Sequence, residues 1–471
     1  MLNAIVGESI LICGESERVR AVEKMLKPLL TFDNPDYEKK VRMGKWTGNT
    51  PRQLSLIRQD GHNLSIPFGM LPWVFEHKRF FDNILSTFKP PVSVDYQSGI
   101  NLYGYQGNAV EAALKARQGV IVAPCGSGKT QIGLELVARI GGRALWVTHT
   151  HDLLSQSMDR AKGVFGIDPI TFGTITAEKM NVGPSITFST VQTLFRADLS
   201  CIKDSFDVVI VDECHHCVGT PTQVTMFSKV LSAIRARYKF GLTATPKRAD
   251  GLTPCMYALI GDKVCEISRE EVEDTTCPVS VEFVETEYSP EYSKILMPDG
   301  TISYPKLISE ITGDRQRNEL ILEVLKNCEY PCLVLTDRVQ HCSDLQSMAA
   351  QAGISCGEIY GFVDKQGRKR RLERLACGSM SVLFGTFALA KEGLDIPELR
   401  TLVMATPQKN ESLVTQAAGR VARKCDGKSC GKIVDLVDKN FGMLAGWKKK
   451  RITMYKKLGF DISESDAQMS F

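Results

Sequence analysis

The sequence contains no long hydrophobic run and no strong excess of either charge. No apolar stretch approaches the roughly 18 residues that a membrane span requires, so we expect no membrane contact. The N-terminal segment has neither a basic start nor a small-residue cleavage site, which argues against a signal peptide. The formal net charge is only +4 over 471 residues. Any affinity for nucleic acid must therefore come from local basic patches.

A disulfide framework, short repeats and low-complexity segments are also missing. The 15 cysteines are scattered and odd in number, which is typical of a protein in a reducing compartment such as the cytoplasm. Without repeats, a chain of this length is expected to hold about two to four globular domains that bury their own cores.

Short apolar runs rich in β-branched residues alternate with helical patterns through most of the chain. One series lies between residues 119 and 246, and a second lies between residues 332 and 438. This alternation is typical of parallel sheets covered by helices, so we predict an α/β fold with two tandem parallel-sheet domains. Residues 1–95 lack the pattern. Residues 54–71 predict two strands around a turn, so a small β-rich accessory domain should precede the sheets.

The segment "APCGSGKT" (123–130) fits the pattern of a phosphate-binding loop, with Ala123 in the place of the first glycine. It follows an apolar strand and precedes a helical pattern, which is the context that this motif requires. The glycines let backbone N–H groups and the helix N-terminus point at a phosphate. Lys129 would add positive charge at the β- and γ-phosphates, and the Thr130 hydroxyl would ligate Mg²⁺. The predicted ATP contacts are Pro124, Cys125, Gly126, Ser127, Gly128, Lys129 and Thr130.

The segment "VDECHHC" (211–217) allows two interpretations. Asp212 and Glu213 end a predicted buried strand, where Asp212 would hold Mg²⁺ and Glu213 would orient or deprotonate the attacking water. Alternatively, Cys214 and Cys217 could form half of a zinc site. Zinc needs four ligands, and the other close cysteine pair lies far away in the second α/β domain. We therefore favour the carboxylate interpretation and expect no zinc.

These and later motifs resemble those of superfamily 2 helicases of the DEAH-like group, here with a DECH box. The resemblance covers roughly residues 100–445, and the motifs come in the family's order. They are "YQGNAV" (105–110), "VTHTHDLLSQ" (147–156), "STVQTL" (189–194), "GLTATP" (241–246), "GTFALAKEGLDIP" (385–397) and "QAAGRVAR" (416–423). An N-terminal module before an XPB-like core is similar to UvsW-type helicases, and particularly to the branch-migrating helicases of T5-like phages.

The resemblance implies two tandem RecA-like domains and a role for each motif. The implied residues are Gln106 near the nucleotide, His215, Thr243 and Thr245 in coupling, Gln416, Arg420 and Arg423 in catalysis, Asp395 on the ribose, and Thr190, Gln192 and Thr386 on nucleic-acid phosphates. Arg420 and Arg423 are three apart on a predicted helix, so they would share a face and stabilise charge on the transferred phosphate. A salt-bridged helix face, or a local cap or turn role for the polar residues, remains open for each one taken alone.

The predicted organisation follows from these motifs. It comprises an accessory nucleic-acid-binding domain at 1–95, RecA-like domains at 96–270 and 271–445, and a basic C-terminal tail at 446–471. Because the helicase motifs begin near Gln106, removal of residues 1–95 should leave both α/β domains whole. The alternative is that this module caps an apolar surface of the first domain, and truncation would then give an insoluble or unfolded protein.

A basic stretch lies within the accessory region. Residues 39–58 carry six basic side chains and no acidic one, with a tryptophan among them. Basic and aromatic residues together suit a nucleic-acid backbone, although a solvated charged face is the alternative. The predicted contacts are Lys39, Lys40, Arg42, Lys45 and Trp46.

We expect an ATP- and Mg²⁺-dependent DNA helicase or translocase that acts on forked or branched DNA in recombination or repair. The family suggests 3′→5′ travel. One alternative is an RNA or transcript-release helicase, because phosphate contacts do not separate DNA from RNA. Another is an ATP-gated nucleic-acid clamp that does not unwind. The expected location is the cytoplasm, or the host cytoplasm for a phage-encoded protein.

Overall fold

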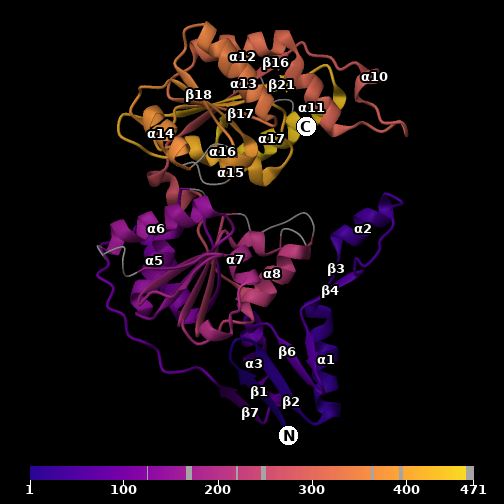
Figure 1. Cartoon of the computed structure of the whole chain (residues 1–471), viewed down its shortest axis with the longest axis vertical. Helices are drawn as coiled ribbons and strands as arrows, with labels where there is room; N and C mark the ends of the chain where they lie inside the picture. The colour runs from indigo at the N-terminus through magenta and orange to yellow at the C-terminus, as the bar shows by residue number, and fades with distance from the viewer. Residues whose placement is uncertain are drawn as a thin grey trace. The chain divides into compact units, whose positions relative to one another are not determined.

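The computed structural model describes residues 1–124, 126–165, 172–218, 221–244, 251–361, 365–391 and 396–462 (Figure 1). The chain divides into two compact units, Met1–Ser268 and Arg269–Phe471. Within the described ranges, no helix combines the length and the apolar character that crossing a bilayer requires.

The first unit is built around an eight-stranded sheet in the order β11-β10-β12-β9-β13-β14-β8-β15. The β10–β11 pair is antiparallel and the other neighbours are parallel. Four central strands are buried along their whole length, as expected for a parallel sheet covered on both faces. The strands are β8 (Gln118–Val122), β9 (Ala144–Thr148), β10 (Gly173–Ile175), β11 (Met180–Asn181), β12 (Ile186–Thr190), β13 (Val208–Asp212), β14 (Tyr238–Thr243) and β15 (Lys263–Glu266).

Helices cover both faces of this sheet. They are α4 (Gly104–Ala116), α5 (Lys129–Ile140), α6 (His151–Phe165), α7 (Val191–Arg196), α8 (Pro221–Leu231) and α9 (Thr253–Ile260). Helices α5 and α6 lie on one side and α7 and α8 on the other, because the chain crosses the sheet through β9 to β12 and then returns through β13 (Figure 1). In such a sheet, ligands bind at the carboxyl ends of the strands where the winding reverses.

The second unit repeats this plan with a seven-stranded parallel sheet in the order β18-β19-β17-β20-β21-β16-β22. Its strands are β16 (Val279–Thr286), β17 (Cys332–Thr336), β18 (Cys356–Ile359), β19 (Val382–Thr386), β20 (Thr401–Met404), β21 (Gly431–Asp438) and β22 (Asp461–Ile462). Its helices are α10 (Tyr292–Ile295), α11 (Tyr304–Gly313), α12 (Arg315–Asn327), α13 (Val339–Gln351), α14 (Lys365–Ala376), α15 (Phe387–Lys391), α16 (Glu411–Val421) and α17 (Gly442–Lys457). The predicted α/β fold with two tandem parallel sheets is confirmed.

The basic stretch after residue 446 is part of this second unit. It lies in helix α17, where Lys448 and Arg451 are buried. Arg451 donates to both carboxylate oxygens of Asp435 at 2.7 and 2.8 Å, and the Tyr455 hydroxyl donates to the same carboxylate at 3.0 Å. Residues 446–462 therefore pack into the folded unit instead of forming a free tail.

Residues before 95 form a mixed sheet in the order β5-β6-β2-β1-β7, with the turn predicted within residues 54–71 joining β5 and β6. The sheet strands are β1 (Leu2–Val6), β2 (Ile10–Gly14), β5 (Arg58–Asp60), β6 (Asn63–Ile66) and β7 (Asn83–Ser86). Helices α1 (Ser16–Leu30) and α3 (Leu71–Glu76) accompany it. A separate ribbon of β3 (Thr31–Asp33) and β4 (Gln53–Ser55) carries helix α2 (Pro35–Arg42) away from the sheet (Figure 1). We call residues 31–55 the arm.

The accessory sheet and the first α/β domain share one hydrophobic core. Leu2, Ile10 and Val74 belong to the same buried cluster as Val120, Ile234 and Ile260. The two parts touch so closely that a β-carbon on Gly69 would lie 2.3 Å from the carbonyl oxygen of Ala258. The expectation that deletion of residues 1–95 leaves the first domain whole is therefore revised, because deletion would expose this core to water.

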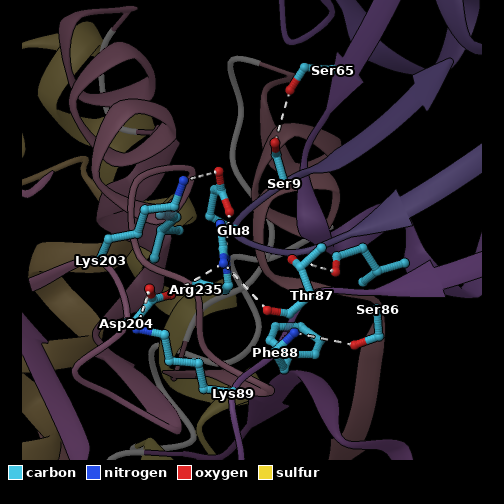
Figure 2. Close-up of polar contacts among 12 residues, drawn as sticks. Glu8, Ser9, Ser65, Ser86, Thr87, Phe88, Lys89, Lys203, Asp204 and Arg235 are labelled. Carbon is cyan, nitrogen blue, oxygen red and sulfur yellow. Dashed lines mark hydrogen bonds and ion pairs between the residues drawn. The ribbon is translucent and has the colours of Figure 1, made fainter.

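Charged groups add to this junction (Figure 2). The Glu8 carboxylate accepts from Lys203 at 2.6 Å and from Arg235 at 2.9 Å. Arg235 also lies 3.4 Å from Asp204, which in turn pairs with Lys89 at 2.9 Å. Glu8 is therefore held from two sides by residues that are about 200 positions away in the sequence, which fixes the register of the accessory sheet on the domain.

A buried lysine completes the junction. Lys239, fully buried on β14, donates to the carbonyl oxygens of Glu8 at 3.0 Å and Leu231 at 2.7 Å. Its amine also lies 4.7 Å from the centre of the Phe68 ring. Burial lowers the pKa of Lys239 from its usual 10.5 to about 7, against the opposing effect of the Glu8 charge.

This pKa predicts how stability depends on pH. Between about pH 7 and 10.5 the unfolded chain binds a proton at Lys239 that the folded chain has lost, so stability should rise with pH across this window. One proton corresponds to at most about 1.4 kcal/mol per pH unit. Chemical unfolding of wild type and Lys239→Met at several pH values should show the wild type gaining relative to the variant from pH 7 to 10. Parallel pH profiles would contradict this assignment.

Candidate functional site

The loop between β8 and α5 has the backbone of a phosphate cradle. Gly126 and Gly128 have φ angles of 88° and 76°, which favour glycine, and Gly128 caps α5. Lys129 begins this helix, and its amine donates to the carbonyl of Ala123 at 3.4 Å. The Ser127 hydroxyl is buried and has no hydrogen-bond partner among the described residues. Pro124 and Thr130 flank the loop and are half-buried, whereas Cys125 lies outside the described residues.

Gln106 braces this loop from helix α4. Its amide nitrogen donates to the Ser127 carbonyl at 2.8 Å, and its amide oxygen accepts from the backbone of Tyr103 at 3.0 Å. A β-carbon on Gly128 would lie 2.4 Å from the same amide nitrogen. The structure therefore places Gln106 against the loop that would hold the phosphates. Both ends of the Gln106 side-chain amide form hydrogen bonds with the protein backbone.

Asp212 and Glu213 lie at the carboxyl end of β13, beside the loop. The Glu213 carboxylate is 3.9 Å from the Lys129 amine, and Asp212 accepts the Glu213 amide at 2.9 Å. Glu213 has a φ angle of 48°, a strained conformation for a residue other than glycine. Backbone strain is common at functional sites, where the surrounding structure holds the residue in place.

The two carboxylates differ in how readily they hold a proton. Burial, and then the charge of Glu213, raise the pKa of Asp212 above its usual range. Burial alone would raise the pKa of Glu213 also, but the Lys129 ammonium and His215 hold it below its usual range. Asp212 is thus a buried carboxylate, and the positive charges of the protein around it do not fully offset its negative charge.

These features suit a nucleotide that carries a bound divalent metal ion. The glycine conformations and the unpartnered Ser127 hydroxyl fit a phosphate group. A divalent cation near Asp212 would supply the missing positive charge, and the oxygen donors of Asp212 and Thr130 are of the kind that Mg²⁺ prefers. The residues present therefore fit both groups.

The two cysteines of the DECH segment point to another role. Cys214 and Cys217 are fully buried, and Cys214 lies 3.6 Å from the Met256 sulfur. Burial raises the pKa of both thiols well above their usual range, so both stay protonated. Protonated thiols pack as small apolar groups.

The rings of His215, His216 and His149 form a series of contacts that begins at Glu213. The His215 ring nitrogen is 3.0 Å from the Thr243 hydroxyl and 3.3 Å from the Glu213 carboxylate. His216 contacts His215 at a centroid distance of 4.3 Å and stacks on His149, also at 4.3 Å and with an interplanar angle of 11°. No sequence pattern distinguishes His149 from its neighbours within the helicase motif at residues 147–156. Thr245, the other predicted coupling hydroxyl, lies outside the described residues.

The predicted strand-contacting residues differ in exposure. Gln192 on α7 is half-buried, and its amide nitrogen donates to the His149 carbonyl at 3.0 Å. Thr190 is buried and caps α7, accepting from the Thr193 amide, which is the local role left open by the sequence. Thr386 ends β19 in the second unit and is half-buried.

The second unit carries the other predicted catalytic residues. Gln416 and Arg420 lie one turn apart on α16, where Arg420 is buried. The helix ends at Val421, so the prediction that Arg420 and Arg423 share a helix face is wrong. The Arg423 backbone instead forms an isolated β-bridge with Thr276, and the Arg423 carbonyl accepts a hydrogen bond from the Lys428 amine at 2.9 Å. These two contacts hold this part of the chain outside the helix. Asp395 lies outside the described residues.

The basic residues of the arm lie on α2 and the turn after it. Lys39, Arg42 and Lys45 are exposed, whereas the Lys40 amine donates to the Thr50 hydroxyl at 2.6 Å. Trp46 is 88% exposed, and its ring lies beside Gly48, where an added β-carbon would meet it at 3.1 Å. The arm thus presents the charges of Lys39, Arg42 and Lys45 and the Trp46 ring to solvent.

A phosphate loop and a carboxylate pair at the carboxyl edge of a parallel sheet define a P-loop nucleotide-binding protein, here with a second parallel-sheet unit. Two family models match the chain: "Type III restriction enzyme, res subunit" over residues 99–248 and "Helicase conserved C-terminal domain" over residues 316–425. The chain belongs to the superfamily 2 helicase family.

Individual relatives agree with this assignment. The chain is 29% identical over 317 residues to "Probable helicase D10" of Escherichia phage T5, a match that covers 67% of this chain and 66% of that protein, just under two thirds of its length. It is 22% identical to "ATP-dependent DNA helicase uvsW" of Enterobacteria phage T4, over 92% of this chain and 89% of that one. Among solved structures, S. cerevisiae Dbp5 bound to RNA has a similar fold, with a TM-score of 0.54 at 15% identity over 86% of this chain and 96% of that one.

Proposed function

We propose that this protein is an ATP-dependent DNA helicase or translocase that acts on forked or branched DNA. The observation that carries the proposal is the position of Lys129 and the Asp212–Glu213 pair at one edge of the parallel sheet, joined by His215 and Thr243 to the rest of the domain. Family membership supports the motor activity. The proposed direction of travel, 3′→5′, and the proposed location in the cytoplasm follow from the family resemblance.

The proposed chemistry divides between the side chains of this site. Lys129 binds the β- and γ-phosphates and stabilises the charge that develops during transfer. Glu213, kept ionised by Lys129 and His215, orients and deprotonates the attacking water. Asp212 and Thr130 hold Mg²⁺, which neutralises phosphate charge when bound. Catalytic roles for Gln416, Arg420 and Arg423, and ribose binding by Asp395, stay predictions from the sequence motifs.

The choice of DNA over RNA rests on two supports. The phage T4 relative, whose match covers 92% of this chain, is named a DNA helicase. The arm presents Lys39, Arg42, Lys45 and Trp46 to solvent, a combination that suits the backbone and an unpaired base at a junction. An RNA helicase and a clamp without unwinding are the other outcomes that the experiments below distinguish.

Neutralising the arm tests this proposal. A triple variant with glutamine at positions 39, 42 and 45 should bind forked DNA more weakly and with less dependence on salt, because each lost phosphate contact lowers the slope of log affinity against log salt by about 0.9 on duplex DNA. Fork-stimulated ATP hydrolysis should fall toward the level seen with linear duplex. Lys40 is retained because its contact with Thr50 supports the arm.

A matched control uses the same accessory region. Arg20, Lys24 and Lys27 are exposed on α1, so their replacement by glutamine changes the net charge equally without touching the arm. This control should behave as wild type on all substrates. Equal loss in both triple variants would mean that only overall charge matters. Stronger stimulation of the wild type by RNA duplex than by any DNA would favour the RNA helicase.

A further inference from the structure

The three-histidine stack continues past the residues that the proposed function uses. His215 sits against Glu213 and Thr243, a contact within the nucleotide site. His216 contacts His215 on one side and His149 on the other, and His149 lies just after the end of β9. These rings follow the ends of two separate strands, β9 and β13, yet they form one continuous column of planar groups.

The far end of the column reaches helix α7. The Gln192 amide nitrogen lies 3.3 Å from the ring nitrogen of His149 and 3.0 Å from its carbonyl oxygen. Gln192 is thus bonded twice to one residue, and Thr190, two positions earlier, starts the same helix. Since all these groups belong to the first unit, the column needs no particular placement of the second unit.

The tight packing of these rings allows a small displacement at one end of the column to move the other end. His215 and His216 are 3% and 7% exposed, so neither ring can turn without displacing a neighbour. Close-packed interiors pass strain between contacting groups because few voids can absorb it. A change in the position of Glu213 would therefore move the His215 ring, the stack and the α7 end together.

We propose that His216 and His149 are positioning residues. They couple Glu213, a carboxylate of the nucleotide site, to Gln192 on α7. This inference rests on the proposed function, because it assigns a path between the ATP site and a segment proposed to contact the nucleic-acid strand. In this assignment His216 and His149 act by fixing the relative positions of Glu213 and Gln192.

The test measures coupling in both directions on the full-length protein. The first readout is the ratio of ATP turnover with saturating oligothymidylate to turnover without it, so that each variant is normalised to its own basal rate. The second is the factor by which a non-hydrolysable ATP analogue changes oligothymidylate affinity, which must equal the reverse effect by linkage. Couplings between two sites are usually about 5- to 150-fold.

We expect His216→Leu and His149→Leu each to reduce the coupling factor about five-fold or more, toward 1. The double variant should lose no more than either single one, because both lie on one path. His216→Phe, which keeps a planar ring between its neighbours, should restore coupling, and it also covers the case in which the leucine variant folds poorly. His151→Leu is the matched control, since this exposed histidine lies two residues beyond the column and should keep wild-type coupling.

The possible results separate this inference from the proposed function. If wild-type turnover does not respond to oligothymidylate or to forked DNA, the proposed function fails. If the wild type responds and His216→Leu and His149→Leu retain its coupling factor, the path through the histidines is refuted. The same refutation follows if His216→Phe loses as much coupling as His216→Leu, because the planar ring is then irrelevant.

Discussion

Replacing Lys129 by alanine should lower ATP turnover by about a hundred- to a thousand-fold, the usual cost of removing one group that stabilises transition-state charge. Lys129 is the cation nearest the carboxylate pair in the described part of the site, at 3.9 Å from Glu213, and its side chain is mostly buried. The fold should survive, because the hydrogen bond that the amine donates to the Ala123 carbonyl is long, at 3.4 Å. Turnover is measured by phosphate release, and folding by the thermal midpoint.

Lys115 provides the control for this substitution. It lies on α4 in the same unit and is exposed, so Lys115→Ala removes the same charge away from the loop. This variant should turn over ATP at the wild-type rate. Normal turnover in Lys129→Ala would contradict the assignment of the phosphate loop.

Replacing Glu213 by glutamine should separate binding from hydrolysis. The attacking water loses its base, which costs about a hundred- to ten-thousand-fold in rate. Asp212 remains, and removal of the neighbouring charge should bring its pKa back down toward its usual range, which keeps it ionised for Mg²⁺. The variant should therefore bind a labelled ATP analogue and forked DNA about as tightly as wild type while it hydrolyses ATP very slowly.

Two comparisons make this result specific. Glu178→Gln changes an exposed glutamate in the same unit and should leave turnover unchanged. Elemental analysis of the purified protein addresses the zinc interpretation of the DECH segment. Stoichiometric zinc that is lost in Cys214→Ser, together with normal turnover in Glu213→Gln, would contradict the carboxylate assignment.

Local patterns in the sequence were sufficient to predict the sheets and the phosphate loop. The strand around residues 207–213 was predictable because four consecutive β-branched residues, Val208 to Val211, precede the charged pair. The loop was predictable because its glycines and Lys129 must stand at fixed spacing between a strand and a helix. Both signals lie within about a dozen residues of chain.

Contacts between distant residues could not be predicted in the same way. The sequence shows Lys239 inside an apolar strand, but nothing near it reveals that its amine reaches the Glu8 carbonyl. The end of α16 before Arg423 likewise depends on a backbone bridge to Thr276, far earlier in the chain. His149 and His216 are 67 positions apart, and only the pairing of β9 with β13 brings the two rings together.

The attachment of the accessory sheet is a third such case. Two of its strands, β5 and β6, were recognisable from the turn at Gly61, but the shared core with the first α/β domain depends on shape. The close approach at Gly69 is visible only when α9 is in place. Side-chain substitutions on the arm are therefore better tests of this region than a deletion.

The central claim is that ATP hydrolysis by this protein separates strands at branched DNA, and strand displacement tests it most directly. The measurement compares a labelled fork, a four-way junction, a linear DNA duplex and an RNA duplex, each with ATP and Mg²⁺, using Lys129→Ala as the blank. We expect ATP-dependent displacement that is fastest on the fork and the four-way junction and absent in the blank. ATP hydrolysis without displacement of any strand, or displacement confined to the RNA duplex, would contradict it.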